Sequence, residues 1–523
     1  MEEKLTDQEL VRRQKVEKLK EMGIDPFGQK FDQKDWSSDI QEKGQQILKD
    51  LGVTEIDPND KSEEHKAYMN TLHEKVEALK LQVSIAGRIM FIRKMGKASF
   101  FSLQDKKGKQ QVYISINDVG EEQYELFKMA DIGDIVGVEG NMMLTQTGAI
   151  TIKCLKFTHL TKALRPLPEK FHGLTDKEER YRRRYVDLIM NEEAKRVALQ
   201  RPRIIRSMQN YFDSLGFVEV ETPVLQSIQG GATARPFITH HNALDKDFYL
   251  RIATELSLKR LIVGGLEKVY EIGRLFRNEG MDLTHNPEFT TVELYQAYGD
   301  LSSMMEISEG VIRQIAKDVA HKEQFMNIFN PEGEKIDISK PFRKVTMCEL
   351  IKEKTGVDFK ANNYSLEEAT KIAKDHNVAV EPHFTVGHII NAFFETFCEE
   401  DLIQPTFLCG NPVAISPLTK KDPSDERFVQ RFELYIGGHE FANAYTELND
   451  PIDQKERFLD QLKERDAGND EANEMDTDFV EALEYGMPPC GGIGIGIDRL
   501  VMFITEQVSI REVLLFPHMR NRE

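Results

Sequence analysis

Two segments that alternate in polarity, 269–277 and 289–295, flank a loop that contains Gly280. Residues two apart on a strand share a face, so the segments predict the two strands of an antiparallel hairpin. One face of the first strand carries Val269, Glu271, Gly273, Leu275 and Arg277, and one face of the second carries Phe289, Thr291, Glu293 and Tyr295. Paired in this way, the strands bring a cation, an aromatic ring and carboxylates onto one patch. That combination suits a small molecule with a phosphate, a ring and an amine.

Short alternating strands also fill the region from 83 to about 160, with turns at Gly108 and Gly148. About five such strands are typical of a small barrel such as the OB-fold, whose surface commonly binds single-stranded nucleic acid. Pro166 and Pro168 then predict a linker, because proline cannot continue a strand ladder or a helix interior.

The region after the linker predicts a larger domain. A helix is expected where Ile204, Met208 and Phe212 recur on one face before Gly216, and a strand over 217–221. No regular βα repeat is visible, which favours an antiparallel sheet over a doubly wound one. The predicted fold class is α+β: an antiparallel sheet flanked by helices, preceded by an N-terminal OB-fold barrel. The expected boundaries are a helical extension at 1–62, the barrel at 63–162, a linker at 163–180 and the large domain at 181–523.

Composition narrows the cellular setting. The five cysteines are scattered without Cys/His metal spacing, which argues against a zinc site and for a reducing compartment. No apolar run approaches the ~18–20 residues of a membrane helix, and the acidic start of the chain is unlike a signal peptide. We therefore expect a cytoplasmic protein that has no membrane partner. The net charge of −19 does not exclude a nucleic-acid partner, because binding depends on local patches.

A strand near the C-terminus carries glycines at 492, 494 and 496, which alternate and therefore leave one face flat. A flat face lets a planar ligand such as a purine approach the backbone, and Arg499 follows at the start of a helix. The alternative is that these glycines only permit tight packing of a helix on the sheet.

Glu433, Glu440 and Glu447 form an acidic series. Two carboxylates held near a polyphosphate can bind Mg²⁺. Carboxylates at this spacing are otherwise ordinary surface groups, but Glu440 lies in an apolar, glycine-containing segment that is unusual for a solvated face.

Together these segments resemble the three signature motifs of class II aminoacyl-tRNA synthetases. Motif 1 is similar to 203–223, motif 2 to 268–298 and motif 3 to 490–516, with a helical insertion at about 345–405. The resemblance extends to the bacterial lysine–tRNA ligases through the segments 230–237, 239–245 and 443–450, and through 95–100 in the barrel. It implies an ATP-dependent ligation of L-lysine to tRNA(Lys) through lysyl-adenylate, by a homodimer that requires Mg²⁺.

The resemblance also implies residue roles. Arg277 and Arg499 are the expected catalytic residues. The expected ATP-binding residues are Arg277, Glu279, His285, Asn286, Phe289, Glu433, Gly496 and Arg499, and the metal ligands are Glu433 and Glu440. The expected lysine-binding residues are Gly231, Glu255, Arg277, Glu293, Tyr295, Asn443, Tyr445 and Glu447.

The sign of the charges in this set favours lysine over aspartate, because carboxylates suit a substrate with two ammonium groups. In the family, Glu293 faces the α-amine with the Gly231 region, and Glu255 and Glu447 face the ε-amine. Thr254 and Ser257 depart from the family pattern, in which Pro and an aromatic residue are common.

In the barrel, Phe100 is expected to stack on an anticodon base, with Arg88, Arg93 and Gln111 as polar contacts. The alternative for Phe100 is core packing. Ala149 departs from relatives that carry an acid at that position.

Three other functions remain open at this stage. One is a sister synthetase for aspartate or asparagine, and another is a paralogue that lysylates a protein. The third is a tRNA-binding paralogue without catalysis, although such proteins usually lose the motif arginines.

Overall fold

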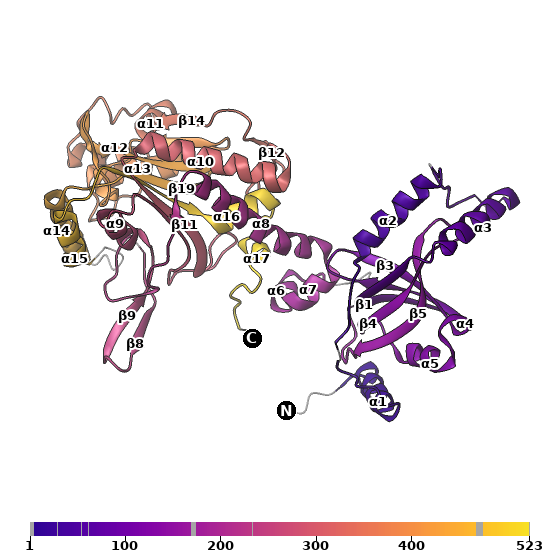
Figure 1. Ribbon diagram of the computed structural model, residues 1–523. Helices are drawn as coiled ribbons and strands as arrows, with labels where there is room; N and C mark the ends of the chain where they lie inside the picture. The colour runs from indigo at the N-terminus through magenta and orange to yellow at the C-terminus, as the bar shows by residue number, and fades with distance from the viewer. Residues whose placement is uncertain are drawn as a thin grey trace. The chain divides into compact units, whose positions relative to one another are not determined.

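The computed structural model describes residues 5–28, 30–53, 55–60, 62–168, 174–232, 234–466 and 474–521. The chain divides into two compact units, Met1–Gly173 and Leu174–Glu523 (Figure 1). Part of the predicted linker, 169–173, lies outside the described residues, as does Thr233 of the segment 230–237. Among the described helices, none combines the length and apolarity needed to cross a membrane.

The first unit is built around a closed five-stranded barrel. Its elements are α1 (Asp7–Glu21), α2 (Ser37–Asp50), α3 (Glu63–Ala78), β1 (Gln82–Met95), β2 (Ala98–Gln104), β3 (Lys109–Ser115), α4 (Ile116–Val119), α5 (Glu121–Met129), β4 (Ile135–Leu144) and β5 (Ile150–Thr161). The strands close in the order β1-β2-β3-β5-β4. The five predicted strands are therefore present.

Alternation along the strands builds the barrel interior. In β2, for example, Phe101 and Leu103 are buried while their neighbours are half-buried. The register of β4 against β5 shifts at Gly140, where an added Cβ would lie only 2.0 Å from the carbonyl oxygen of Lys153. Only glycine allows this close approach of two backbones.

The N-terminal helices share the barrel core. Leu19, Ile40 and Val53 are buried in the same apolar cluster as the strand residues. A capping box between Thr6 and Glu9 begins α1 and satisfies otherwise unpaired amide groups. The described part of the segment 1–62 and the barrel therefore form one packed unit.

The second unit contains an eight-stranded sheet in the order β14-β15-β18-β19-β20-β11-β10-β6. The strands are β6 (Val218–Glu219), β10 (Lys268–Phe276), β11 (Glu288–Ala297), β14 (Arg343–Thr346), β15 (Thr406–Cys409), β18 (Arg431–Ile436), β19 (His439–Thr446) and β20 (Cys490–Gly496). All pairs from β15 to β10 are antiparallel, and the pairs at the two edges are parallel. The predicted strand at 217–221 is shorter than expected, because within the described residues it pairs only with β10.

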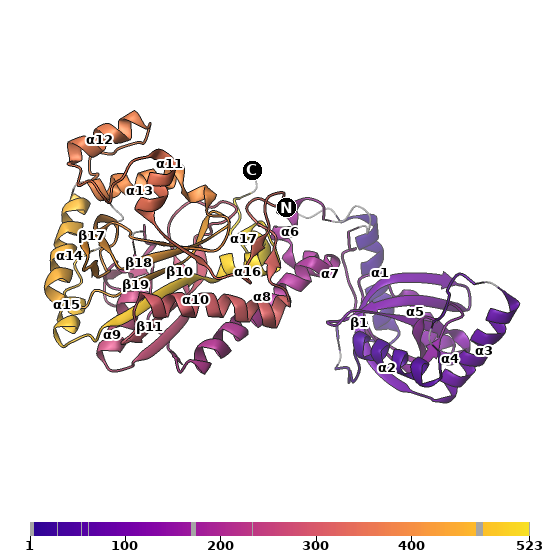
Figure 2. The ribbon, with the colours of Figure 1, turned by 90° about the horizontal axis from the view of Figure 1, so that it is seen from above.

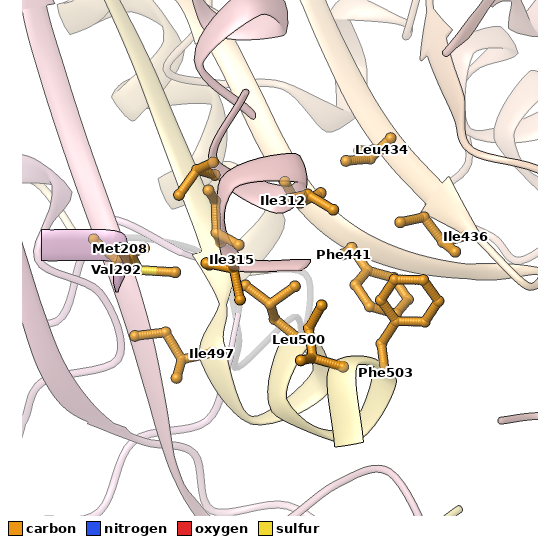
Figure 3. Close-up of a cluster of buried hydrophobic side chains, with 14 of the residues drawn as sticks. Met208, Val292, Ile312, Ile315, Leu434, Ile436, Phe441, Ile497, Leu500 and Phe503 are labelled. Carbon is orange, nitrogen blue, oxygen red and sulfur yellow. The ribbon is translucent and has the colours of Figure 1, made fainter. Parts of the chain in front are cut away.

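Helices cover one face of this sheet. They are α8 (Glu192–Ser214), α10 (Leu301–Ile315) with its π-helical continuation η1 (Ala316–Ala320), and α16 (Ile497–Thr505). Figure 3 shows Met208, Ile312 and Leu500 packed against side chains of the strands. Phe441 of β19 and Phe503 of α16 meet edge to face, with ring centroids 5.7 Å apart. The helix predicted over 204–215 is present and is followed by Gly216 at φ +82°.

The remaining elements complete the second unit. They are α6 (Lys177–Arg182), α7 (Arg184–Met190), β7 (Leu225–Gln226), β8 (Ile238–His241), β9 (Lys246–Leu250), α9 (Glu255–Val263), β12 (Gln324–Phe325), β13 (Ile336–Asp337), α11 (Met347–Thr355), α12 (Leu366–Asp375), α13 (Val386–Phe397), η2 (Glu399–Asp401), η3 (Val413–Ile415), β16 (Lys421–Asp422), β17 (Asp425–Val429), α14 (Pro451–Asp466), α15 (Thr477–Glu484) and α17 (Ile510–Val513). Figures 1 and 2 show α11, α12 and α13 gathered as the predicted helical insertion, which has its own apolar cluster.

Candidate active site

β10 and β11 pair as the predicted hairpin, and their register places Leu275 opposite Phe289 and Glu271 opposite Glu293. The glycine strand β20 pairs with β11 on the other side, so that Gly494 lies opposite Glu293 and Gly492 opposite Tyr295. Because paired residues of antiparallel strands share a face, the three glycines leave a flat strip between the side chains of β11 and β19.

This face of the sheet forms the floor of a cavity of about 810 Å³. The predicted residues that line it are Gly231, Glu255, Arg277, Glu279, His285, Asn286, Phe289, Glu293, Tyr295, Glu433, Glu440, Asn443, Tyr445, Gly496 and Arg499. Glu447 belongs to the predicted set but lies behind this lining, almost completely buried.

At one end of the cavity lie the two motif arginines. The guanidinium of Arg277 lies 5.2 Å from the ring centroid of Phe289, and its buried Nε has no hydrogen-bond partner among the described residues. Arg499 donates a hydrogen bond to the backbone carbonyl of Glu440. His285 is exposed and pairs with Asp282 at 2.8 Å.

The position of Arg499 is fixed by its neighbour Asp498, which ties the three motifs together. Asp498 Oδ1 lies 2.6 Å from Arg201 of α8, and its Oδ2 accepts a hydrogen bond of 2.7 Å from the amide of Thr290 in β11. The start of α16 is thus bound both to the motif 1 helix and to the motif 2 strand.

Glu433 and Glu440 lie on neighbouring strands beside the arginines. Burial, followed by the charge of Glu433, raises the pKa of Glu440 to about 7, while Arg431, Arg499 and Arg277 act in the opposite direction. Glu433 pairs with Arg431 through one oxygen and accepts a hydrogen bond of 3.2 Å from Asn411 through the other. A carboxylate whose pKa is raised by burial and by a neighbouring carboxylate forms, with that neighbour, a fitting pair of ligands for a divalent cation.

The other end of the cavity is acidic. Burial and the neighbouring Glu255 raise the pKa of Glu293 to about 7, and burial raises the pKa of Glu447 to about 8. Glu293 accepts hydrogen bonds from the amide of Thr254 at 3.3 Å and from the hydroxyl of Tyr295 at 3.4 Å. Carboxylates with raised pKa values in a cavity indicate a binding site for a cationic ligand, because such a ligand would stabilise their ionised form.

Comparison with known proteins agrees with this arrangement. Residues 176–520 match the family of class II tRNA synthetases for D, K and N, and residues 83–160 match the OB-fold nucleic acid binding domain. The chain is 55% identical to the lysine–tRNA ligase of Enterococcus faecalis, over 99% of this chain and 98% of that protein. It is 52% identical to the lysine–tRNA ligase of Staphylococcus epidermidis and 53% identical to that of Staphylococcus aureus, over the full length of each.

The chain belongs to the lysine–tRNA ligase family. The class II synthetase domain of this family accounts for the antiparallel sheet, and its OB-fold domain accounts for the barrel. Both parts of the predicted fold class are confirmed.

Lys259 is a buried residue of this site that the sequence interpretation missed. It lies one helical turn after Glu255 on α9, and its Nζ is 2.6 Å from Glu255 Oε1. The same Nζ contacts Glu447 Oε2, and the side chain has no solvent exposure. The i,i+4 spacing from Glu255 was a signal in the sequence for the first contact, but the sequence gives no signal for the second.

Arg431 is a second missed residue. Its guanidinium pairs with Glu433, donates a hydrogen bond of 3.0 Å to Asn443 Oδ1, and lies 5.6 Å from the ring centroid of Tyr445. It also donates to Ser416 at 3.0 Å. One buried cation therefore connects a predicted metal ligand with two predicted lysine contacts.

The departures from the family pattern lie at the start of α9. Thr254 is the residue that precedes this helix, and its buried hydroxyl has no hydrogen-bond partner among the described residues. Ser257 is half-buried in the first turns of the helix. Neither residue lines the cavity.

In the barrel, the four predicted anticodon residues lie on the outer face of β1, β2 and β3. Phe100 is half-buried and lies opposite Arg93 and Tyr113, with 5.1 Å between the centroids of the Phe100 and Tyr113 rings. Gln111 is half-buried on β3, and Arg88 donates a hydrogen bond of 2.7 Å to the carbonyl of Gly133. The core position is occupied by the next residue, Phe101. Ala149 lies in the β4–β5 turn, where its amide donates to Thr145 Oγ1.

Proposed function

We propose that this protein ligates L-lysine to the 3′ end of tRNA(Lys) with ATP, through lysyl-adenylate, and releases AMP and pyrophosphate. Relatives named lysine–tRNA ligase match essentially the whole chain. The observation that carries the proposal is the cluster of Glu255, Glu293 and Glu447 at the acidic end of the site. Lys259 supplies only one cation for these three carboxylates, so aspartate or asparagine would leave their negative charge incompletely balanced, whereas lysine brings two ammonium groups.

The chemistry requires no protein nucleophile. The carboxylate of lysine attacks the α-phosphate of ATP, and the negative charge that builds on the phosphate is stabilised by preorganised cations. We assign Arg277 to the α-phosphate and to the lysine carboxylate, and Arg499 to the γ-phosphate. Both line the cavity at the end away from the acidic cluster, which supports this assignment. The terminal hydroxyl of tRNA then attacks the adenylate.

The remaining nucleotide contacts follow from the same placement. The ring of Phe289 and the guanidinium of Arg499 would enclose the adenine. Glu279, His285 and Asn286 lie in or beside the motif 2 loop, and Gly496 leaves the end of β20 open to the base. Asn443 and Tyr445 of β19 would flank the aliphatic stem of lysine.

We assign Mg²⁺ to Glu433 and Glu440. Mg²⁺ is commonly held by one or two carboxylates together with phosphate oxygens and water, which this pair of residues allows. When bound, it would neutralise charge on the phosphates. Among the described residues no cluster of three His, Cys, Asp or Glu forms a metal site, so the nucleotide would supply the other ligands.

For tRNA we assign the anticodon contact to the outer face of the barrel. Phe100 would stack on a base, and Arg88, Arg93 and Gln111 would contact its edge or the backbone. The presence of all four residues on one face supports this assignment.

We infer that the protein is a homodimer and is cytoplasmic. Leu199 of α8, Val218 of the edge strand β6 and Ile238 of β8 are exposed apolar residues near motif 1, and a second copy of the chain would cover them. All five cysteines are buried free thiols, which supports a reducing compartment.

Amino-acid-dependent exchange of pyrophosphate into ATP tests the function. We expect exchange with lysine alone among the twenty amino acids, followed by charging of tRNA(Lys). Exchange with aspartate or asparagine would identify a sister enzyme. Binding of tRNA without any exchange would identify a non-catalytic paralogue, and lysylation of a protein in place of tRNA would identify a protein-modifying one.

A further inference from the structure

Lys259 gives the acidic end of the cavity its own internal cation. Its Nζ contacts one oxygen of Glu255 and one of Glu447, and all three side chains are essentially excluded from solvent. The carbonyl oxygen of Leu418 lies 3.5 Å from the same Nζ. A buried ammonium held in this way is of the same chemical kind as the ε-ammonium of the proposed substrate.

Both carboxylates are placed to take a second partner. Glu255 contacts Lys259 through Oε1 and also lines the cavity. Glu447 Oε1 has no hydrogen-bond partner among the described residues. It lies beside Gly492, where an added Cβ would be 2.2 Å from this oxygen and 2.5 Å from the ring of Tyr295. Since Gly492 lines the cavity and Glu447 does not, this oxygen of Glu447 lies just behind the cavity floor.

The charges in this region balance when lysine is bound. Glu255, Glu293 and Glu447 bring three negative charges, and Lys259 brings one positive charge. The two negative charges that remain equal the number of ammonium groups on lysine, whose carboxylate is assigned to Arg277. The charge of Arg431 is already paired with Glu433.

Other titratable groups that face the cluster do not alter this balance. Tyr295 of β11, Tyr445 of β19 and Cys490 of β20 all have pKa values raised by burial, so they are neutral near pH 7. Burial also raises the pKa of Glu255, and the charge of Lys259 opposes that shift. Without Lys259, a proton would have to take its place between the two carboxylates.

We propose that Lys259 is a positioning residue for amino-acid selection, which orients Glu255 and Glu447 and favours their ionised form, so that they accept hydrogen bonds from the ε-ammonium of lysine. This inference rests on the proposed function. It adds a residue that does not line the cavity and acts on the substrate only through the two carboxylates.

The test uses Lys259→Met, which keeps an unbranched side chain of similar length and removes its charge. We expect the KM for lysine in pyrophosphate exchange to rise about tenfold or more, while the KM for ATP changes less than about twofold. We expect the KM for lysine to fall as the pH rises. In Lys259→Met this fall should occur at a pH about one unit or more higher than in the wild type, because a carboxylate must first lose the proton that replaced Lys259. A role in packing alone would not shift the pH profile.

Arg260→Met is the matched control on the same helix, because Arg260 pairs with Asp476 and Asp478 and does not line the cavity. It should leave both KM values and the pH profile unchanged. An unchanged lysine KM and pH profile in folded Lys259→Met would overturn the proposal.

A second comparison remains decisive if Lys259→Met does not fold. Glu255→Gln is compared with Glu255→Gln/Lys259→Met, in which one negative and one positive charge are both removed. We expect the second substitution to lower or leave unchanged the lysine KM of Glu255→Gln, since it restores the balance of two negative charges. A further rise in the lysine KM would overturn the proposal. Failure of the wild-type protein to exchange pyrophosphate with lysine would instead refute the proposed function itself.

Discussion

Replacement of Glu447 by Gln removes one buried charge and preserves the shape of the side chain. In the proposed complex this carboxylate accepts a hydrogen bond from the ε-ammonium of lysine. A hydrogen bond to a charged group contributes about 1.5–3 kcal/mol, and about 1.4 kcal/mol corresponds to a tenfold change in affinity. Glu447 is only 1% exposed, so solvent does not weaken this interaction. We therefore expect the KM for lysine to rise roughly 10- to 100-fold, with an unchanged KM for ATP.

The pH dependence of the same variant provides an independent check. Burial raises the pKa of Glu447 to about 8, so in the free protein this group binds a proton that lysine must displace. The lysine KM of the wild type should fall as the pH rises toward that value, and the profile of Glu447→Gln should be flatter. The assay is lysine-dependent pyrophosphate exchange, with Glu484→Gln on the exposed side of α15 as the control. An unchanged lysine KM in Glu447→Gln would refute the assignment of this residue.

Four further outcomes are expected. Gly492→Ala should raise the lysine KM strongly, because its Cβ would lie 2.2 Å from Glu447 Oε1. Gly494→Ala should change the lysine KM only weakly, because the nearest atom to its Cβ would be 3.6 Å away. Pyrophosphate-exchange kinetics would measure both variants. Arg499→Gln should lower the exchange rate by roughly 10²–10³-fold without unfolding the protein, as rates and circular dichroism would show. Phe100→Ala should weaken charging of tRNA(Lys) by about 1–3 kcal/mol of stacking and leave tRNA-independent exchange unchanged. Because the pKa values of Glu293 and Glu447 are raised in the folded state, the free protein should lose stability between about pH 4.5 and about pH 8, and saturating lysine should increase Tm more at the upper end of this range.

Much of the fold followed from local patterns. The period-two alternation in 269–277 and 289–295 gave both strands of the hairpin and the face that each residue occupies, because strand geometry fixes the face once the strand is identified. The glycine strand and the helix that carries Arg499 were predictable for the same reason. The strand at 217–221 was less predictable, because its length depends on a partner strand that lies elsewhere in the sequence.

The same distinction holds for the candidate site. The sequence by itself determined which types of residue are available and which of them share a face: the arginines, the aromatic ring of Phe289, the flat glycine strip and the carboxylates. Only the tertiary structure decided what lies opposite each of them. The packing of α9 against β10 and β11 places Lys259 between Glu255 and Glu447, the residue that follows β19. The pairing of β18 with β19 places Arg431 beside Asn443. Local periodicity specifies the direction of a side chain, but the partner of a buried charge is set by contacts between segments far apart in the chain.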